Sequence, residues 1–201
     1  MKNELLALWQ RISASGNAEA IYNILHARYN LAYKFYHTEE HIDEGLVDFK
    51  EIKSSLEFPD ETELAWIFHD AIYKPKKSNN EAKSAELLVK VCGYGKISTE
   101  FSERASRRVI VTDHKTPPIS FDELAMVDLD LAIFGKPEER FNQYEEAIRK
   151  EYFYAPNSLY RQKRAEILTF FKNKPYNLSY FQEKYESQKQ KNLERAIQQL
   201  R

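Results

Sequence analysis

The chain has 201 residues, and its 30 basic against 31 acidic residues leave a net charge of −1. This balance gives no basis for a nucleic-acid groove or a membrane-surface patch, so we expect neither partner. The single cysteine, Cys92, excludes an internal disulfide and a cysteine-rich zinc site. No apolar run approaches the roughly 20 residues of a transmembrane helix. The first residues lack the apolar length of a signal peptide, and we expect a cytoplasmic protein.

Helical periodicity dominates the chain, and strand alternation is almost absent. The expected helices cover about 3–13, 18–30, 38–57, a segment opening near 60, then about 78–92, 98–112, 120–134, 138–153, 158–172 and 179–200. We therefore predict an all-α bundle of about eight to nine helices. It forms a single domain over 1–201, with the C-terminal helices of 158–201 packing on that same domain.

Several helix starts carry the spacing of an N-cap residue followed three positions later by an acid. The pairs are Asp60 with Glu63, Ser78 with Glu81, and Ser120 with Glu123. Ser98 or Thr99 is expected to start another helix. On the helix predicted over about 38–57, the apolar residues Ile42, Leu46, Phe49, Ile52 and Leu56 share one face.

The most informative feature is the pair His69-Asp70 inside an apolar run from Glu63 to Tyr73. Burying an unpaired polar or charged group is costly, so both side chains need a reason to be there. A metal ion supplies one, because it takes an imidazole and a carboxylate from adjacent helical positions about 100° apart. Further ligands are available in His41 upstream and in Asp128 or Asp130 downstream.

Helical projection separates the alternatives for the other ligands. His41 lies about 80° from Phe49, at the edge of the apolar stripe, whereas His37 lies about 120° away and is placed at the mouth of a site. Downstream, we expect a buried face of Leu124, Val127, Leu131 and Phe134. Asp130 lies about 60° from Val127 and Asp128 about 100° away on the other side, so a regular helix cannot aim both at one ion. We favour Asp130 and keep Asp128 as the alternative.

A His, a His-Asp pair and a distant Asp, all on helices, resemble the HD superfamily of metal-dependent phosphohydrolases, and more closely the predicted HD phosphohydrolases of bacteria. The resemblance covers nearly the whole chain. The matching motifs are Lys34-Phe-Tyr-His-Thr-Glu-Glu-His-Ile42, Phe68-His-Asp-Ala-Ile-Tyr73, Asn80-Glu-Ala-Lys-Ser-Ala85, Val111-Thr-Asp-His114, Asp128-Leu-Asp-Leu-Ala-Ile-Phe-Gly135 and Tyr160-Arg-Gln-Lys-Arg-Ala-Glu-Ile-Leu168. One departure is Lys34, where arginine is expected, which weakens any bidentate contact to phosphate or carboxylate there.

The resemblance implies one divalent metal ion held by His41, His69, Asp70 and Asp130. Mn²⁺, Fe²⁺, Co²⁺, Ni²⁺, Zn²⁺ and Mg²⁺ are not distinguished by the sequence. A water acidified by the ion would attack phosphorus, and Asp70 would both ligate the ion and orient that water. Lys34, Lys74, Lys77 and Lys115, together with Lys76, are the candidates for contacts with substrate phosphate.

Three further residues are candidate catalytic groups with simpler roles beside them. Glu81 is either a proton donor to the leaving group or only the acid of a capping box with Ser78. His114 either faces the site or caps a helix C-terminus by its charge. His37 is a candidate substrate contact. The lysines of 74–77 can equally form a solvated loop.

The rival reading of His37 and His41 as a zincin motif fails, because Thr38 stands where that chemistry requires the glutamate base. The expected function is hydrolysis of a phosphate ester of a small molecule, with nucleotides as the leading class. The alternative is a non-catalytic HD module that binds a nucleotide or metal for regulation. The sequence leaves a homodimer open.

Overall fold

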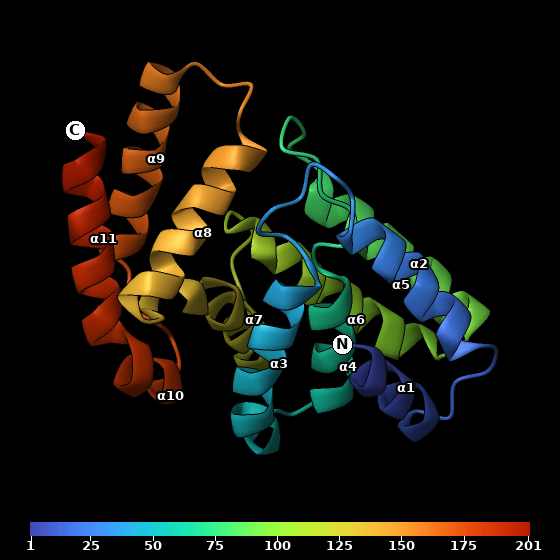
Figure 1. The fold of residues 1–201 in the computed structure, drawn as a ribbon. Helices are drawn as coiled ribbons and strands as arrows, with labels where there is room; N and C mark the ends of the chain where they lie inside the picture. Colours follow the sequence, from blue (N-terminus) through green and yellow to red (C-terminus); the bar gives the residue numbers. More distant parts are fainter. The chain divides into compact units, whose positions relative to one another are not determined.

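A computed structural model describes residues 1–201 and is all-helical, without strands (Figure 1). This confirms the predicted all-α class. The α-helices are α1 (Lys2–Arg11), α2 (Ala18–Tyr29), α3 (Glu39–Ile52), α4 (Pro59–Phe68), α5 (Asn80–Tyr94), α6 (Thr99–Ile110), α7 (Phe121–Leu131), α8 (Glu138–Glu151), α9 (Asn157–Lys172), α10 (Ser179–Phe181) and α11 (Ser187–Leu200). Short 3-10 helices are η1 (Lys53–Ser55), η2 (Val111–Asp113) and η3 (Ala132–Gly135), and η4 (Gln182–Glu186) is a π-helix. None of these helices has the length and apolar character needed to cross a bilayer.

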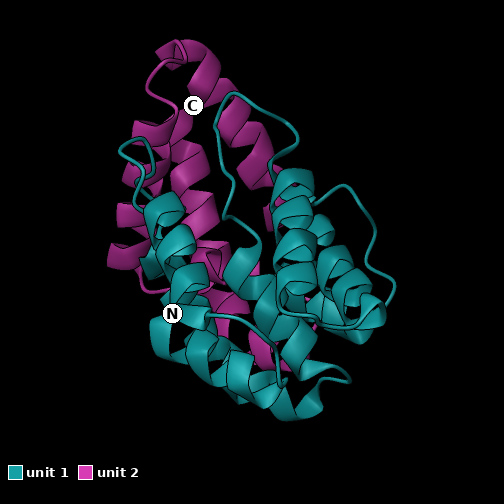
Figure 2. Cartoon of the chain, turned by 90° about the vertical axis from the view of Figure 1, so that its right-hand side faces the viewer, with its two compact units in different colours: residues 1–129 teal, residues 130–201 magenta.

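The chain divides into two compact units, Met1–Leu129 and Asp130–Arg201, coloured separately in Figure 2. The division falls inside α7, between Leu129 and Asp130. The prediction of one domain over 1–201 stays a prediction.

Helix α4 forms the centre of the first unit. Its residues Leu64 to Phe68 are completely buried, including the large side chain of Trp66. Around it, α3 contributes four residues of the predicted apolar stripe, from Ile42 to Ile52, and the fifth, Leu56, follows η1; all five are buried. Because this part of α4 is surrounded by protein on all sides, its sequence is a continuous apolar run and not an amphipathic pattern.

Two predicted helix starts are wrong. Helix α4 begins at Pro59, whose fixed φ and missing N–H suit the first helical position. The carboxylates of Asp60 and Glu63 instead form ion pairs with the Arg11 guanidinium, with N···O distances of 2.8 and 2.7 Å. Helix α5 begins at Asn80, so Ser78 and Glu81 form no capping box. The Asn80 side chain instead binds the backbone of Lys74: its Oδ1 accepts from the Lys74 N–H, and its Nδ2 donates to the Lys74 carbonyl.

Two other predicted starts are confirmed. Ser98 Oγ accepts from the backbone N–H of Phe101, and Ser120 Oγ accepts from that of Glu123. The Glu123 carboxylate, however, accepts from the backbone N–H of Ile119 rather than from that of Ser120.

In the second unit, α8, α9 and α11 lie side by side (Figure 1). The predicted helices over 158–172 and 179–200 correspond to α9 and to the run from α10 to α11. Fully or nearly fully buried aromatic side chains form its core, namely Phe134, Phe141, Tyr176 and Phe181. Gly135 has no room for a Cβ because the backbone and Cβ of Tyr185 lie against it.

Candidate metal centre

His41 is the third residue of α3 and is only 3% exposed. Its Nδ1 lies 3.0 Å from the hydroxyl of Tyr36, on the segment that leads into the helix. A phenol can donate or accept this hydrogen bond. With Nδ1–H donating to Tyr36, the Nε2 lone pair of His41 is directed away from the tyrosine as a metal ligand.

His69 and Asp70 lie at the C-terminal end of α4. The helix ends at Phe68, so the expectation that both residues lie within it is wrong by one or two positions, although His69 keeps helical dihedral angles. His69 Nδ1 lies 2.8 Å from the carbonyl oxygen of Trp66. A carbonyl only accepts, so Nδ1 carries the proton and Nε2 is the nitrogen that can coordinate a metal.

The potential ligand atoms converge. His69 Nε2 lies 3.2 Å from His41 Nε2 and 3.1 Å from an Asp70 carboxylate oxygen, Oδ2. The same Asp70 oxygen lies 3.8 Å from His41 Nε2. These three side chains are at most 10% exposed. Since the negative end of the α4 dipole is at its C-terminus, the place where they meet favours a cation.

Trp66 fixes both imidazoles. Its indole is stacked on the His69 ring at 4.4 Å and meets the His41 ring edge-on at 5.1 Å. The indole Nε1 donates to the carbonyl of Ile42 on α3 at 2.9 Å. Gly45, one helical turn beyond His41, leaves the space for this ring, since a Cβ there would collide with it. One tryptophan thus aligns the ends of α3 and α4.

Asp130 completes a group of four, in which one ligand atom from each of His41, His69, Asp70 and Asp130 lies within 4.8 Å of every other. Asp130 is the first residue after the division between the two units, but it belongs to the continuous helix α7 that begins at Phe121. Asp128 is not in this group, although it is completely buried.

The buried face of α7 differs from the expected one. Of the expected face of α7, Leu124, Val127 and Leu131 are half-buried, and only Phe134 is buried. The apolar residues that α7 buries are Ala125, Met126 and Leu129. Asp130, which the projection favoured, lies in the group of four, although α7 buries a different face.

The donor set suits a divalent ion. Two neutral imidazoles and two carboxylates bring two negative charges into a largely buried place, which is costly unless a cation compensates them. Nitrogen and oxygen ligands in equal number are compatible with Mn²⁺, Fe²⁺, Co²⁺, Ni²⁺ or Zn²⁺. The group can hold a metal ion, whose identity the residues do not fix.

The other predicted catalytic residues lie on separate elements. His37 is half-buried, stacks on Tyr73 with ring centroids 3.6 Å apart, and lies 6.4 Å from the His41 ring. Glu81 is half-buried in the first turn of α5. His114 follows η2 in a left-handed conformation, with φ of 55°. His37 is therefore close to the ligand group, and the roles of all three residues stay predictions.

Lys34 is buried, unlike the other predicted substrate lysines. Its ammonium donates to the backbone carbonyl of Asp70 at 2.7 Å and lies 4.7 Å from the centre of the Tyr29 ring. It therefore holds the backbone of a ligand residue in place. Lys74, Lys77 and Lys115 are exposed.

Sequence reasoning missed Tyr36, Trp66 and Gly45 as parts of the site. Trp66 precedes His69 by three residues, the spacing at which a carbonyl at a helix end can receive an imidazole N–H. That spacing is the only signal in the chain that pointed to it. No known protein-family model, curated protein or solved structure matches the chain.

Proposed function

We propose that the protein is a metal-dependent phosphohydrolase of the HD type that acts on a small phosphorylated molecule, with nucleotides as the leading class. The observation that supports the proposal most strongly is the convergence of His41, His69, Asp70 and Asp130 within 4.8 Å of one another. When bound there, a divalent ion supplies Lewis acidity toward a phosphoryl oxygen and lowers the pKa of a bound water.

The residues of the chain have distinct tasks in this proposal. Asp70 orients the attacking water, because its Oδ2 lies 3.1 Å from His69 Nε2 and 3.8 Å from His41 Nε2. His37, stacked on Tyr73 beside the ligand group, contacts the substrate. Glu81 or His114 supplies the proton for the leaving group. The exposed ammonium groups of Lys74, Lys77 and Lys115 attract substrate phosphate as point charges.

Phosphate release tests the proposal. Purified protein is incubated with a panel of nucleotides and sugar phosphates and with Mn²⁺, Co²⁺ or Mg²⁺. We expect metal-dependent turnover of at least one ester by the wild type and none by Asp70→Ala. The matched control is Glu86→Ala, which removes an exposed carboxylate paired with Lys83 on α5 and should leave turnover unchanged.

The panel also separates the proposal from its alternative. If the wild type binds metal stoichiometrically and no phosphate ester turns over, the proposal of an enzyme fails. The same group of residues then belongs to a module that binds a metal or a nucleotide without chemistry.

A further inference from the structure

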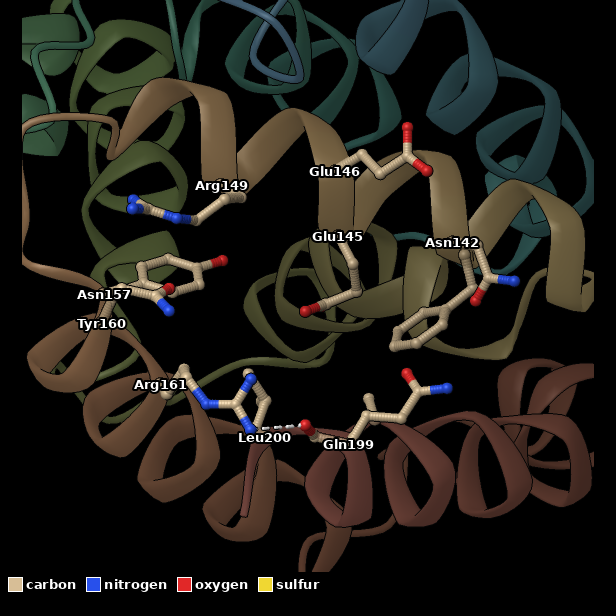
Figure 3. Close-up of a pocket in the computed structure, with 11 residues that line it drawn as sticks. Asn142, Glu145, Glu146, Arg149, Asn157, Tyr160, Arg161, Gln199 and Leu200 are labelled. Carbon is tan, nitrogen blue, oxygen red and sulfur yellow. Dashed lines mark hydrogen bonds between the residues drawn. The ribbon is translucent and has the colours of Figure 1, made fainter.

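The second unit contains a cavity of about 460 Å³ between α8, α9 and α11. This volume lies within the range of roughly 300–1,000 Å³ that small-molecule sites occupy. Figure 3 shows the lining residues, which come from all three helices. The cavity is built only from residues beyond Leu129, and neither the metal ligands nor their partners Tyr36 and Trp66 line it.

Two arginines of this cavity are held by backbone carbonyls rather than by carboxylates. Arg149 donates to the carbonyls of Tyr152 and Ala155, at 2.7 and 3.3 Å. Arg161 donates to the carbonyl of Gln199 at 2.8 Å, a bond drawn in Figure 3. A carbonyl orients a guanidinium without neutralising it, so both groups keep their full charge and their remaining donors.

The aromatic ring of Tyr160 lies against one of the two arginines, Arg149. The Arg149 guanidinium lies 4.6 Å from the centre of this ring, and Arg161 is the next residue along α9. Figure 3 shows Arg149, Tyr160 and Arg161 in succession along one side of the cavity. This arrangement presents two cations and a phenol on one wall.

The two carboxylates of the cavity do not cancel this charge. Glu145 is paired with the buried guanidinium of Arg164, with both of its oxygens accepting from that group. Glu146 is exposed, and Figure 3 shows it turned away from the arginines. With Glu145 neutralised, the charged lining of the cavity keeps an excess of one positive charge.

The rest of the lining offers an apolar surface and free polar groups. Phe141 and Ala196 are buried, and Leu200 is half-buried. The side-chain amides of Asn157 and Gln199 lie at the exposed rim. Arginine recognises planar or tetrahedral oxyanions through paired N–H donors.

We propose that this cavity binds a small organic anion, which presents a carboxylate or phosphate to Arg149 and Arg161 and lays an apolar body against Phe141, Ala196 and Leu200. The site is separate from the proposed metal centre and does not depend on the proposed function. An anion bound there also bridges α8 and α9 through the guanidinium donors that the backbone carbonyls leave unused.

The test uses the full-length, metal-free, ¹⁵N-labelled protein and three probes with the same phenyl group. Benzylphosphonate and phenylacetate carry the two oxyanions, and benzyl alcohol carries none. We expect at least one of the anions to shift the side-chain amide signals of Asn157 and Gln199, with benzyl alcohol producing no shift at the same concentration. The anion that binds more tightly identifies phosphate or carboxylate as the preferred group.

Variants locate the binding. Arg161→Gln and, separately, Arg149→Gln should each weaken affinity about tenfold or more, as expected for losing a charge-assisted hydrogen bond. Lys163→Gln removes an exposed cation two residues along α9 that is paired with Glu166, and should leave affinity unchanged, as should His69→Ala. The proposal is overturned if neither anion binds at millimolar concentration, if benzyl alcohol binds as tightly, or if both folded arginine variants keep wild-type affinity.

Discussion

The Tyr36 hydroxyl lies 3.0 Å from His41 Nδ1, and this contact favours Nε2 as the nitrogen of the imidazole that coordinates. Tyr36→Phe removes the oxygen and leaves the ring, which is buried beside His41. We expect affinity for a divalent ion to fall about tenfold, the lower end for loss of such an outer partner. Isothermal titration of metal-free protein measures it.

Tyr33→Phe is the control for this experiment, because Tyr33 is a half-buried tyrosine on the same segment with no hydrogen bond from its hydroxyl. It should bind metal as the wild type does. Equal affinities for Tyr36→Phe and Tyr33→Phe would show that the Tyr36 hydroxyl has no role in coordination.

The aspartates of α7 give a second prediction at this scale. Asp130→Asn replaces a ligand carboxylate by a neutral amide, so metal affinity should fall by about tenfold or more, whereas Asp128→Asn should retain the wild-type value. Circular dichroism confirms that each variant is folded before titration. The opposite order of affinities would assign the ligand to Asp128.

At the level of residues, the four side chains that converge could be predicted, and the residues that hold them in place could not. His69 and Asp70 stand out because a polar pair in an apolar run needs compensation. The contribution of Gly45 depends on where the Trp66 ring passes, and that position follows from how α3 packs on α4. The sequence pattern of a single helix does not show how that helix packs on another, so the role of Gly45 could not be predicted.

Among the helices, α4 is positioned by a buried carboxylate from α7. Asp122 is 1% exposed and accepts from the backbone N–H groups of Glu57 and Phe58, just before the helix begins. It also accepts from the buried guanidinium of Arg108 at 2.8 Å. One side chain therefore connects α6 and α7 to the start of the helix that leads to His69.

We expect Asp122→Ala to lower the free energy of unfolding by about 3 kcal/mol, because it leaves Arg108 buried without its carboxylate and the two N–H groups without an acceptor. Urea unfolding followed by circular dichroism measures this. Glu86→Ala, on the exposed Lys83 pair, is the comparison and should keep the wild-type midpoint. Equal midpoints for both variants would contradict this account of α4.

Helix periodicity predicted the elements well, but helix starts were predicted unevenly. Ser98 and Ser120 accept from backbone N–H groups as their spacing indicates. Asp60 fails because Pro59 already starts the helix, and its carboxylate pairs with Arg11 from α1. A capping pattern is read from a few neighbouring residues, whereas the group that binds the Asp60 carboxylate here is Arg11, 49 residues away in the sequence.

For the whole molecule, the fold class followed from the sequence and the division into two units did not. The boundary falls within a continuous helix, at Leu129, with no linker composition to mark it. The cavity lined by Arg149 and Arg161 could not be predicted either, because its lining comes from three separate helices. Both features depend on which helices meet, which composition and periodicity leave open.

The central claim is that His41, His69, Asp70 and Asp130 form one metal site. Titration of metal-free protein with Mn²⁺, Co²⁺ and Zn²⁺, in parallel with the His69→Ala variant, tests it most directly. The account predicts one ion bound per chain by the wild type and loss of that binding in the variant. A wild-type protein that binds none of the three ions, or a folded variant that binds as tightly as the wild type, would contradict it.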